Sequence, residues 1–258
     1  MTLWSLFNPT QFSFARIPRF RWNSSVAIRV APLSIVYMCI IIFNPLFLQH
    51  VEVTTYHFSH SLSIAFSLIF SFYMLQIEHS GSVNSACVVI MLGLCVCSMG
   101  SLNFSVAGAF YAVAWPAVVS IYGIYLKKTL TALKNDVWAL IQYNTILSLA
   151  TLTPLVILSG ELKSVLNEVW FLDETGFWIQ MIITSLTGFA VNVIMVLLIL
   201  YTSPLTLVVA SINKTILQAF LATLLFGNPM SLMNVVGMLV SLTGTCYYIY
   251  TRYNEFYS

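Results

Sequence analysis

Charged side chains are the scarcest feature of this sequence. Asp, Glu, Lys and Arg make up only 7% of the 258 residues, whereas 59% are hydrophobic and the mean hydropathy is +0.91. A soluble domain carries about a quarter charged residues, so this composition cannot cover a water-facing surface. The net charge of +2 gives no support for nucleic acid as a partner. We therefore expect an integral membrane protein whose surroundings are the lipid bilayer.

Several patterns that carry chemistry are also missing. The five cysteines lie in apolar runs, and neither their odd number nor their spacing suggests a disulfide framework or a zinc site. There is no glycine-rich phosphate loop, no pair of carboxylates within an apolar run and no His/Asp/Ser grouping that would form one site. These absences argue against an enzyme and against a resident cofactor or metal.

Long hydrophobic runs dominate what is present. A spanning helix needs about 20 largely apolar residues. We expect an all-α polytopic membrane protein with about eight transmembrane helices in one domain, residues 30–250. A basic and aromatic N-terminal tail, residues 1–29, and a C-terminal tail, residues 251–258, flank it. The expected spans are 30–48, 55–77, 83–100, 104–126, 137–159, 177–200, 204–226 and 231–250.

The positions of Lys and Arg predict the orientation. With the N-terminus in the cytosol, eight of the ten fall on the cytosolic side and only Lys163 on the other. Cytosolic loops of membrane proteins carry such an excess, so both termini are expected in the cytosol. The eight are Arg16, Arg19, Arg21, Arg29, Lys127, Lys128, Lys134 and Arg252.

Two stretches resemble an internal repeat. Residues 74–93 and 224–244 each join two apolar helices by a tight connection, followed by a Ser-x-Asn or Ser-x-x-Asn start at Ser82 and Ser231. The connections fall on opposite sides of the membrane, so the two units have inverted topology. Inverted repeats are typical of secondary transporters, with the substrate site near the midplane between them.

Lys214 lies halfway along an expected span, where no Asp or Glu is available to pair with it. An ionisable side chain near the bilayer centre costs at least about 2.5–3.5 kcal/mol. Lys214 is therefore expected to face a polar cavity and to bind an anionic ligand, and a flexible point charge suits phosphate. The alternative is a neutral lysine, or one that snorkels to an interface.

Four other polar residues are candidate ligand contacts. The amide of Asn144 could pair with the edge of a nucleobase and the ring of Tyr143 could stack on it, although membrane Asn often only bonds a neighbouring helix. His60 could add positive charge beside a phosphate, or be a hydrogen-bonded packing residue. Asn213 points about 100° away from Lys214, so the two cannot face a cavity centre equally.

The chain resembles the nucleotide-sugar transporters of the drug/metabolite transporter superfamily, closest to GDP-fucose transporters. The resemblance rests on four ordered stretches, "APLSIVYMCIIIFNPLFLQHVEVTTYHFSHSL" (31–62), "DVWALIQYNT" (136–145), "LSGEL" (158–162) and "YTSPLT" (201–206). Two motifs match in part. "QYNT" is similar to the Phe-Tyr-Asn-Asn motif of guanine-nucleotide sugar transporters, and "ASINK" to Gly-Ala-Leu-Asn-Lys of the GDP-mannose branch.

The resemblance implies that Tyr143 and Asn144 read the base, while Asn213 and Lys214 hold the phosphate–sugar end. It implies an antiporter that exchanges GDP-fucose for GMP by alternating access in the Golgi membrane, with the ER membrane as the alternative. Its fold would be an inverted-repeat bundle that lacks the family's first two helices. His60 and Gln49 stand where the family usually has a cation.

Two alternatives stay open. The cargo could be a UDP-sugar or a triose-phosphate-type metabolite rather than a GDP-sugar. A chain without two helices could instead be a non-transporting scaffold that associates with a full-length relative, and a homodimer is a further arrangement. A nucleotide panel separates the cargoes, and co-purification separates the scaffold from a carrier.

Overall fold

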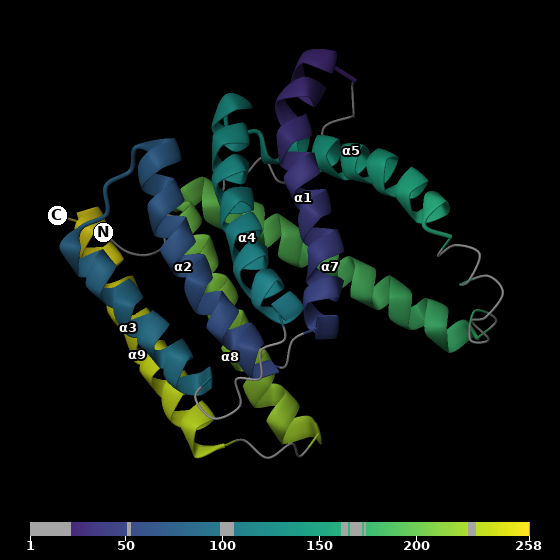
Figure 1. Cartoon of the computed structure of the whole chain (residues 1–258). Coiled ribbons are helices and arrows are strands. Elements are labelled where there is room, and N and C mark those ends of the chain that lie inside the picture. Colours follow the sequence, from purple (N-terminus) through teal and green to yellow (C-terminus); the bar gives the residue numbers. More distant parts are fainter. Residues whose placement is uncertain are drawn as a thin grey trace.

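The computed structural model describes residues 22–50, 53–98, 106–160, 174–226 and 231–257, together with residues 165 and 172. Within these residues the chain forms eight long helices and no strand (Figure 1). Seven of them are long and apolar enough to cross a membrane, so the expected all-α polytopic membrane protein is confirmed. The helices are α1 (Ser24–His50), α2 (Val53–Leu75), α3 (Gly81–Ser98), α4 (Val106–Ala132), α5 (Val137–Leu158), α7 (Thr175–Tyr201), α8 (Pro204–Phe226) and α9 (Leu232–Tyr257).

Short polar side chains fix where several helices begin. The carboxylate of Asp136 accepts the backbone N–H of Ala139 at 3.0 Å and caps α5. Ser80 accepts the N–H of Val83 at 3.3 Å at the start of α3. Such caps satisfy N–H groups that the helix leaves without an internal partner. The α4–α5 turn reverses the chain through Lys134 and Asn135, both at positive φ.

Proline inside α4 shows how the bundle satisfies its backbone. Pro116 has no N–H, so the carbonyl oxygen of Ala112, four residues earlier, loses its helical partner. The hydroxyl of Ser59 on α2 donates to that oxygen at 2.8 Å. Within a bilayer no water can replace a missing bond, and a hydroxyl from a neighbouring helix is one of the few remedies. The serine therefore ties α2 to α4 at the proline.

The hairpins α2–α3 and α8–α9 pack against each other in opposite directions (Figure 1). The α2–α3 connection lies at the upper end of the view, and α8 runs down from that end before α9 returns. The serine caps extend the likeness, because Ser231 accepts the N–H of Met233 at 3.2 Å as α9 begins. Ser80, rather than Ser82, is its structural counterpart. This arrangement is the inverted pair that the similarity between residues 74–93 and 224–244 predicted.

Helices α3 and α9 approach each other at backbone contact. A Cβ built on Gly237 would lie 2.4 Å from the backbone nitrogen of Cys97 and 2.6 Å from the carbonyl oxygen of Gly93. No side chain larger than hydrogen fits there without moving a helix. Small residues permit the close packing that joins helices in membranes, where lipid removes the hydrophobic driving force.

Helices α5 and α7 lead away from the rest of the bundle (Figure 1). Val193, Val196 and Ile199 near the end of α7 are buried in a core shared with α4, α5 and α8. Residues 178–191 of α7 are exposed throughout. α7 and α8 therefore diverge from the turn that joins them, and this divergence determines the surroundings of Lys214.

Candidate functional site

Lys214 lies near the middle of α8, and its side chain is exposed. Seven residues earlier on the same helix face, Leu207 is buried in the core shared with α4, α5 and α7. At Lys214 no such packing of described residues covers the helix, because α7 diverges from α8 along its length. No hydrogen bond or ion pair to Lys214 exists among the residues that the structure describes. The lysine thus presents an ammonium group without a described partner at mid-helix, and the cavity and anionic ligand expected for it stay predictions.

Asn213 and Gln218 have different relations to this ammonium group. The amide nitrogen of Asn213 donates to the carbonyl oxygen of Val209 at 3.0 Å, within α8. Its Oδ1 is buried and has no partner among the described groups. Gln218 is exposed one turn after Lys214, on the same face. Gln218 is therefore a further polar neighbour of Lys214, and its spacing of four residues on a helix is visible in the sequence.

Tyr143 and Asn144 lie next to each other on α5, and their hydrogen bonds go to α1 and to the residue before it. Asn144 is 7% exposed, and its Oδ1 accepts the hydroxyl of Ser34 at 3.0 Å. Tyr143 accepts the backbone N–H of Asn23 at 2.7 Å, and its ring lies 5.8 Å from that of Trp22. The interhelical bond, one of the two interpretations of Asn144, is the one present in this conformation. No hydrogen bond between described residues joins α5 to α8.

His60 is buried on α2, 5% exposed, in an aromatic cluster. Its ring stands edge-on to Trp115 at 5.0 Å between centroids, and Trp115 in turn stacks on Phe47 at 5.4 Å. Ser59, the neighbouring residue, bonds α4 at Ala112. These contacts describe a packing role, and they supply no contact between His60 and Lys214.

The remaining cations of the described chain gather at one end of the bundle. Arg29 donates to the carbonyl oxygen of Ala132 at 3.3 Å, which places the start of α1 beside the end of α4. Arg252 on α9 reaches Ser203 before α8 at 3.3 Å. Lys127 caps the end of α7, where its ammonium group donates at 2.8, 3.2 and 2.9 Å to the carbonyl oxygens of Ile199, Leu200 and Thr202.

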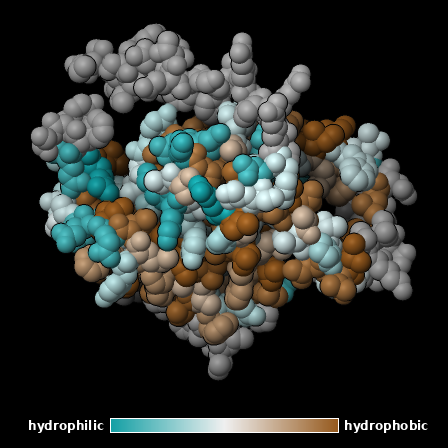
Figure 2. Space-filling view, turned by 90° about the horizontal axis from the view of Figure 1, so that it is seen from above, coloured by the Kyte–Doolittle hydropathy of each residue, from teal (hydrophilic) through white to brown (hydrophobic). Residues whose placement is uncertain are grey.

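We call this end, which also carries Lys128 and Lys134, the basic end; hydrophilic side chains gather there in the view from above (Figure 2). Of the Lys and Arg residues that the structure describes, Lys214 alone lies elsewhere. Cations at helix C-termini complement the helix dipole as well as the free carbonyl groups. Arg16, Arg19, Arg21 and Lys163 lie outside the described residues.

Two hollows open at the basic end, and neither is lined by Lys214. One, of about 510 Å³, lies beside Thr206, Tyr248 and Arg252. The other, of about 470 Å³, lies beside His79 and Asn84. Burial lowers the pKa of His79 below its ordinary value, and nearby Arg252 lowers it further. The described residues include no group of three or more His, Cys, Asp or Glu side chains that could hold a metal ion.

Comparison of the sequence with known proteins identifies a family. The profile of the Triose-phosphate Transporter family matches residues 2–249. The GDP-fucose transporter 1 of Dictyostelium discoideum is 35% identical over 239 residues, which are 93% of this chain and 65% of that protein. The GDP-fucose transporter 1 of Mus musculus is 32% identical over 238 residues, 91% of this chain and 65% of that protein.

A third relative, described as "GDP-fucose transporter, Golgi" in Drosophila melanogaster, is 30% identical over 200 residues, 76% of this chain and 58% of that protein. The chain thus covers 58–65% of the length of these relatives. Their names describe transporters and not enzymes. With a profile match over nearly the whole chain and a bundle of membrane-spanning helices, this protein belongs to the triose-phosphate transporter family.

Proposed function

We propose that this chain carries a nucleotide sugar across a membrane, and that Lys214 binds the phosphate groups of the cargo. The unpaired ammonium group in the middle of α8 is the observation on which this rests. A charge at membrane depth is costly unless it has a partner or lines a wet cavity. A dianionic phosphate that enters and leaves would supply that partner transiently.

The cargo that fits best is GDP-fucose, exchanged for GMP by alternating access. Several relatives bear the name GDP-fucose transporter, and the inverted hairpins α2–α3 and α8–α9 are the architecture on which rocking carriers are built. Asn213, one residue before Lys214, carries a buried and unpartnered Oδ1 that could accept a sugar hydroxyl once α8 is in contact with cargo.

Base recognition by Tyr143 and Asn144 requires a rearrangement. The Oδ1 of Asn144 is occupied by Ser34, and Tyr143 by Asn23. One bond comes from α1 and the other from Asn23, the residue just before it, so a movement of α1 away from α5 would release both side chains together. An amide freed in this way can form paired hydrogen bonds with a guanine edge. His60 would then act through packing of α2 against α4 rather than on the phosphate.

The basic end is proposed to face the cytosol, because cytosolic faces of membrane proteins carry the excess of Lys and Arg. Both described chain ends, near Asn23 and Glu255, lie at this end. The name of the Drosophila melanogaster relative favours the Golgi membrane as the location.

The test is thermal stability of the purified chain with GMP, UMP, GDP-fucose or a triose phosphate. A ligand at a hundred times its dissociation constant adds about 2.7 kcal/mol to the folded state. We expect GMP and GDP-fucose to stabilise the protein, Lys214→Met to abolish the effect, and Leu221→Ala, an exposed change on the same helix, to retain it. Stabilisation by UMP or triose phosphate alone would reassign the cargo. No stabilisation by any of them would contradict a carrier formed by this chain alone and favour a scaffold.

A further inference from the structure

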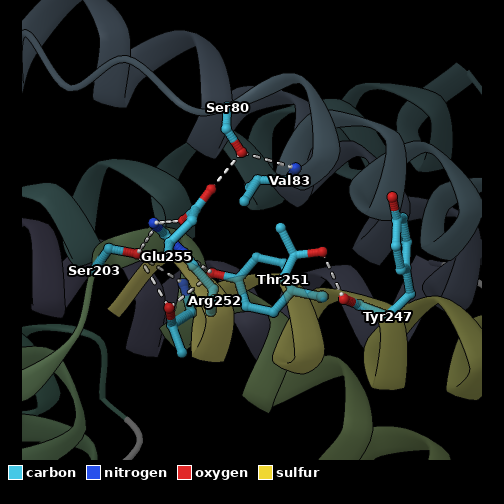
Figure 3. A network of polar contacts seen from close by, with 9 residues as sticks. Ser80, Val83, Ser203, Tyr247, Thr251, Arg252 and Glu255 are labelled. Atoms are coloured by element: carbon cyan, nitrogen blue, oxygen red, sulfur yellow. Dashed lines mark hydrogen bonds and ion pairs between the residues drawn. The ribbon is translucent and has the colours of Figure 1, made fainter. Parts of the chain in front are cut away.

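A polar network at the basic end joins the two inverted hairpins (Figure 3). On α9, the guanidinium of Arg252 donates to Glu255 at 3.0 Å and to Ser203, just before α8, at 3.3 Å. The other carboxylate oxygen of Glu255 accepts the hydroxyl of Ser80, in the α2–α3 connection. We call Ser80, Ser203, Arg252 and Glu255 the clasp.

The clasp is anchored at the starts of α3 and α8 and in the last turns of α9. Ser80 also caps α3 through the N–H of Val83, and Ser203 caps α8 through the N–H of Thr206 at 3.3 Å. Below Arg252 the phenol of Tyr248 is 1% exposed and bonds Thr206 at 2.8 Å. A displacement of the clasp residues is therefore coupled to a displacement of the helix ends that carry them.

We propose that the clasp is the gate of the basic end, and that Arg252 and Glu255 are positioning residues that hold this end closed in the conformation described here. This inference deepens the proposed carrier function and rests on it for its role in transport. Carriers with inverted repeats work by rocking one repeat against the other. At the basic end, α2–α3 can separate from α8–α9 only when the Ser80–Glu255 contact breaks.

The exposure of the ion pair suits a gate that must open repeatedly. Arg252 and Glu255 keep 33% and 32% of their side-chain surface exposed. Solvent-exposed ion pairs contribute little to stability, because water competes for both partners. A deeply buried pair would lock the end closed. This one can be replaced by water at small cost.

The hydroxyl partners make a sharp test possible. Ser80, Ser203 and Tyr248 can each donate or accept a hydrogen bond. Exchanging the charges, Arg252→Glu with Glu255→Arg, therefore keeps an ion pair between the two positions and leaves each neighbouring hydroxyl able to donate where it accepted, or to accept where it donated. Arg252→Gln or Glu255→Gln removes the pair without that compensation. A pair that closes the gate is restored by the exchange, whereas a side chain that matters only for its own packing is not.

The native cysteines report closure without any need for transport. Cys87 and Cys97 on α3 are both buried, 0% and 1% exposed, in a core to which α2, α8 and α9 also contribute. Cys87 lies toward the clasp and Cys97 about 15 Å further along α3. Cys246 on α9 is exposed and serves as a control for reagent access. The rate of alkylation at each cysteine, measured by peptide mass spectrometry, therefore separates local opening from general loosening.

The experiment treats the full chain in proteoliposomes with N-ethylmaleimide. We expect both single variants to speed alkylation of Cys87 about fivefold, equivalent to about 1 kcal/mol, with Cys97 and Cys246 unchanged. The charge exchange returns Cys87 to the wild-type rate. Unchanged Cys87 in both single variants, an exchange variant as fast as they are, or equal acceleration at Cys97 would each overturn the clasp.

Transport supplies the second measurement. A gate that opens more often raises the fraction of protein competent to bind at the basic end, and the apparent dissociation constant falls by that factor. The single variants should therefore lower the KM for GDP-fucose presented at the basic end by about fivefold, and the exchange should restore it. An unaltered KM in active single variants would overturn the gate role. If the wild type itself carries no cargo, the proposed function fails and the labelling result alone decides whether the clasp exists.

Discussion

Replacing Gly237 by alanine tests the α3–α9 interface. The new Cβ would meet the backbone nitrogen of Cys97 at 2.4 Å and the carbonyl oxygen of Gly93 at 2.6 Å. Carbon atoms pack at about 3.5–4.0 Å. Because both obstacles are backbone atoms, no rotamer change relieves the clash, and the helices must move apart by about 1 Å.

The cost can be worked from this geometry. Overpacking a well-packed interface costs about 1–3 kcal/mol, and the upper half applies here because a gap opens along the helix pair. Alanine returns about 1 kcal/mol through its better helix propensity. We expect Gly237→Ala to lose about 1–2 kcal/mol of stability to unfolding. At Gly188 on α7 no heavy atom lies within 4 Å of the new Cβ, so Gly188→Ala should only gain stability, through the better helix propensity of alanine.

The assay is equilibrium unfolding in mixed micelles titrated with SDS, followed by circular dichroism. The two glycine variants should differ by about 2–3 kcal/mol, with Gly237→Ala the less stable. Equal stability of the two variants would refute the close approach of α3 and α9.

Three further predictions concern single side chains. Lys127→Ala should cost about 1.5–3 kcal/mol in the same unfolding assay, because three carbonyl oxygens at the end of α7 lose a charged donor. The exposed neighbour Lys128→Ala should change stability by less than about 0.5 kcal/mol, and equal effects would contradict the cap. Ser34→Ala should lower the free energy of unfolding by about 0.5–1.5 kcal/mol, because it removes the bond to Asn144. An unchanged free energy of unfolding would show that this bond is not formed in solution. His79, whose pKa is lowered in the folded protein by burial and by Arg252, binds a proton more readily when unfolded. Its contribution is therefore present above pH 6.5 and lost as the pH falls below that value, and His79→Gln should flatten this part of the stability profile. An identical profile in the variant would contradict the assignment.

Composition and hydropathy were sufficient to predict the helical membrane architecture. The helix ends were less predictable. α1 begins at Ser24 rather than at residue 30, and α9 continues to Tyr257 rather than to residue 250. Polar residues at both places remain helical because residues of other elements bond their side chains. Arg252 on α9, for example, donates to Ser203 just before α8. Hydropathy along the sequence records no such partners.

The candidate site shows the same limit. Lys214 could be found from sequence, because a charge between two apolar stretches is visible without any structure. That Asn144 would bond Ser34, and that His60 would stand against Trp115, depends on which faces of distant helices meet. The inverted hairpins were predictable from matching connections, whereas the clasp that joins them was not, since Ser80 and Glu255 lie far apart in the chain.

Counterflow measures whether Lys214 binds the phosphate of an exchanged nucleotide sugar. Proteoliposomes loaded with GMP are given labelled GDP-fucose, with wild type, Lys214→Met and Leu221→Ala compared at equal protein content. We expect uptake that depends on internal GMP in wild type and in Leu221→Ala, and none above empty vesicles in Lys214→Met. Undiminished uptake by Lys214→Met would contradict it.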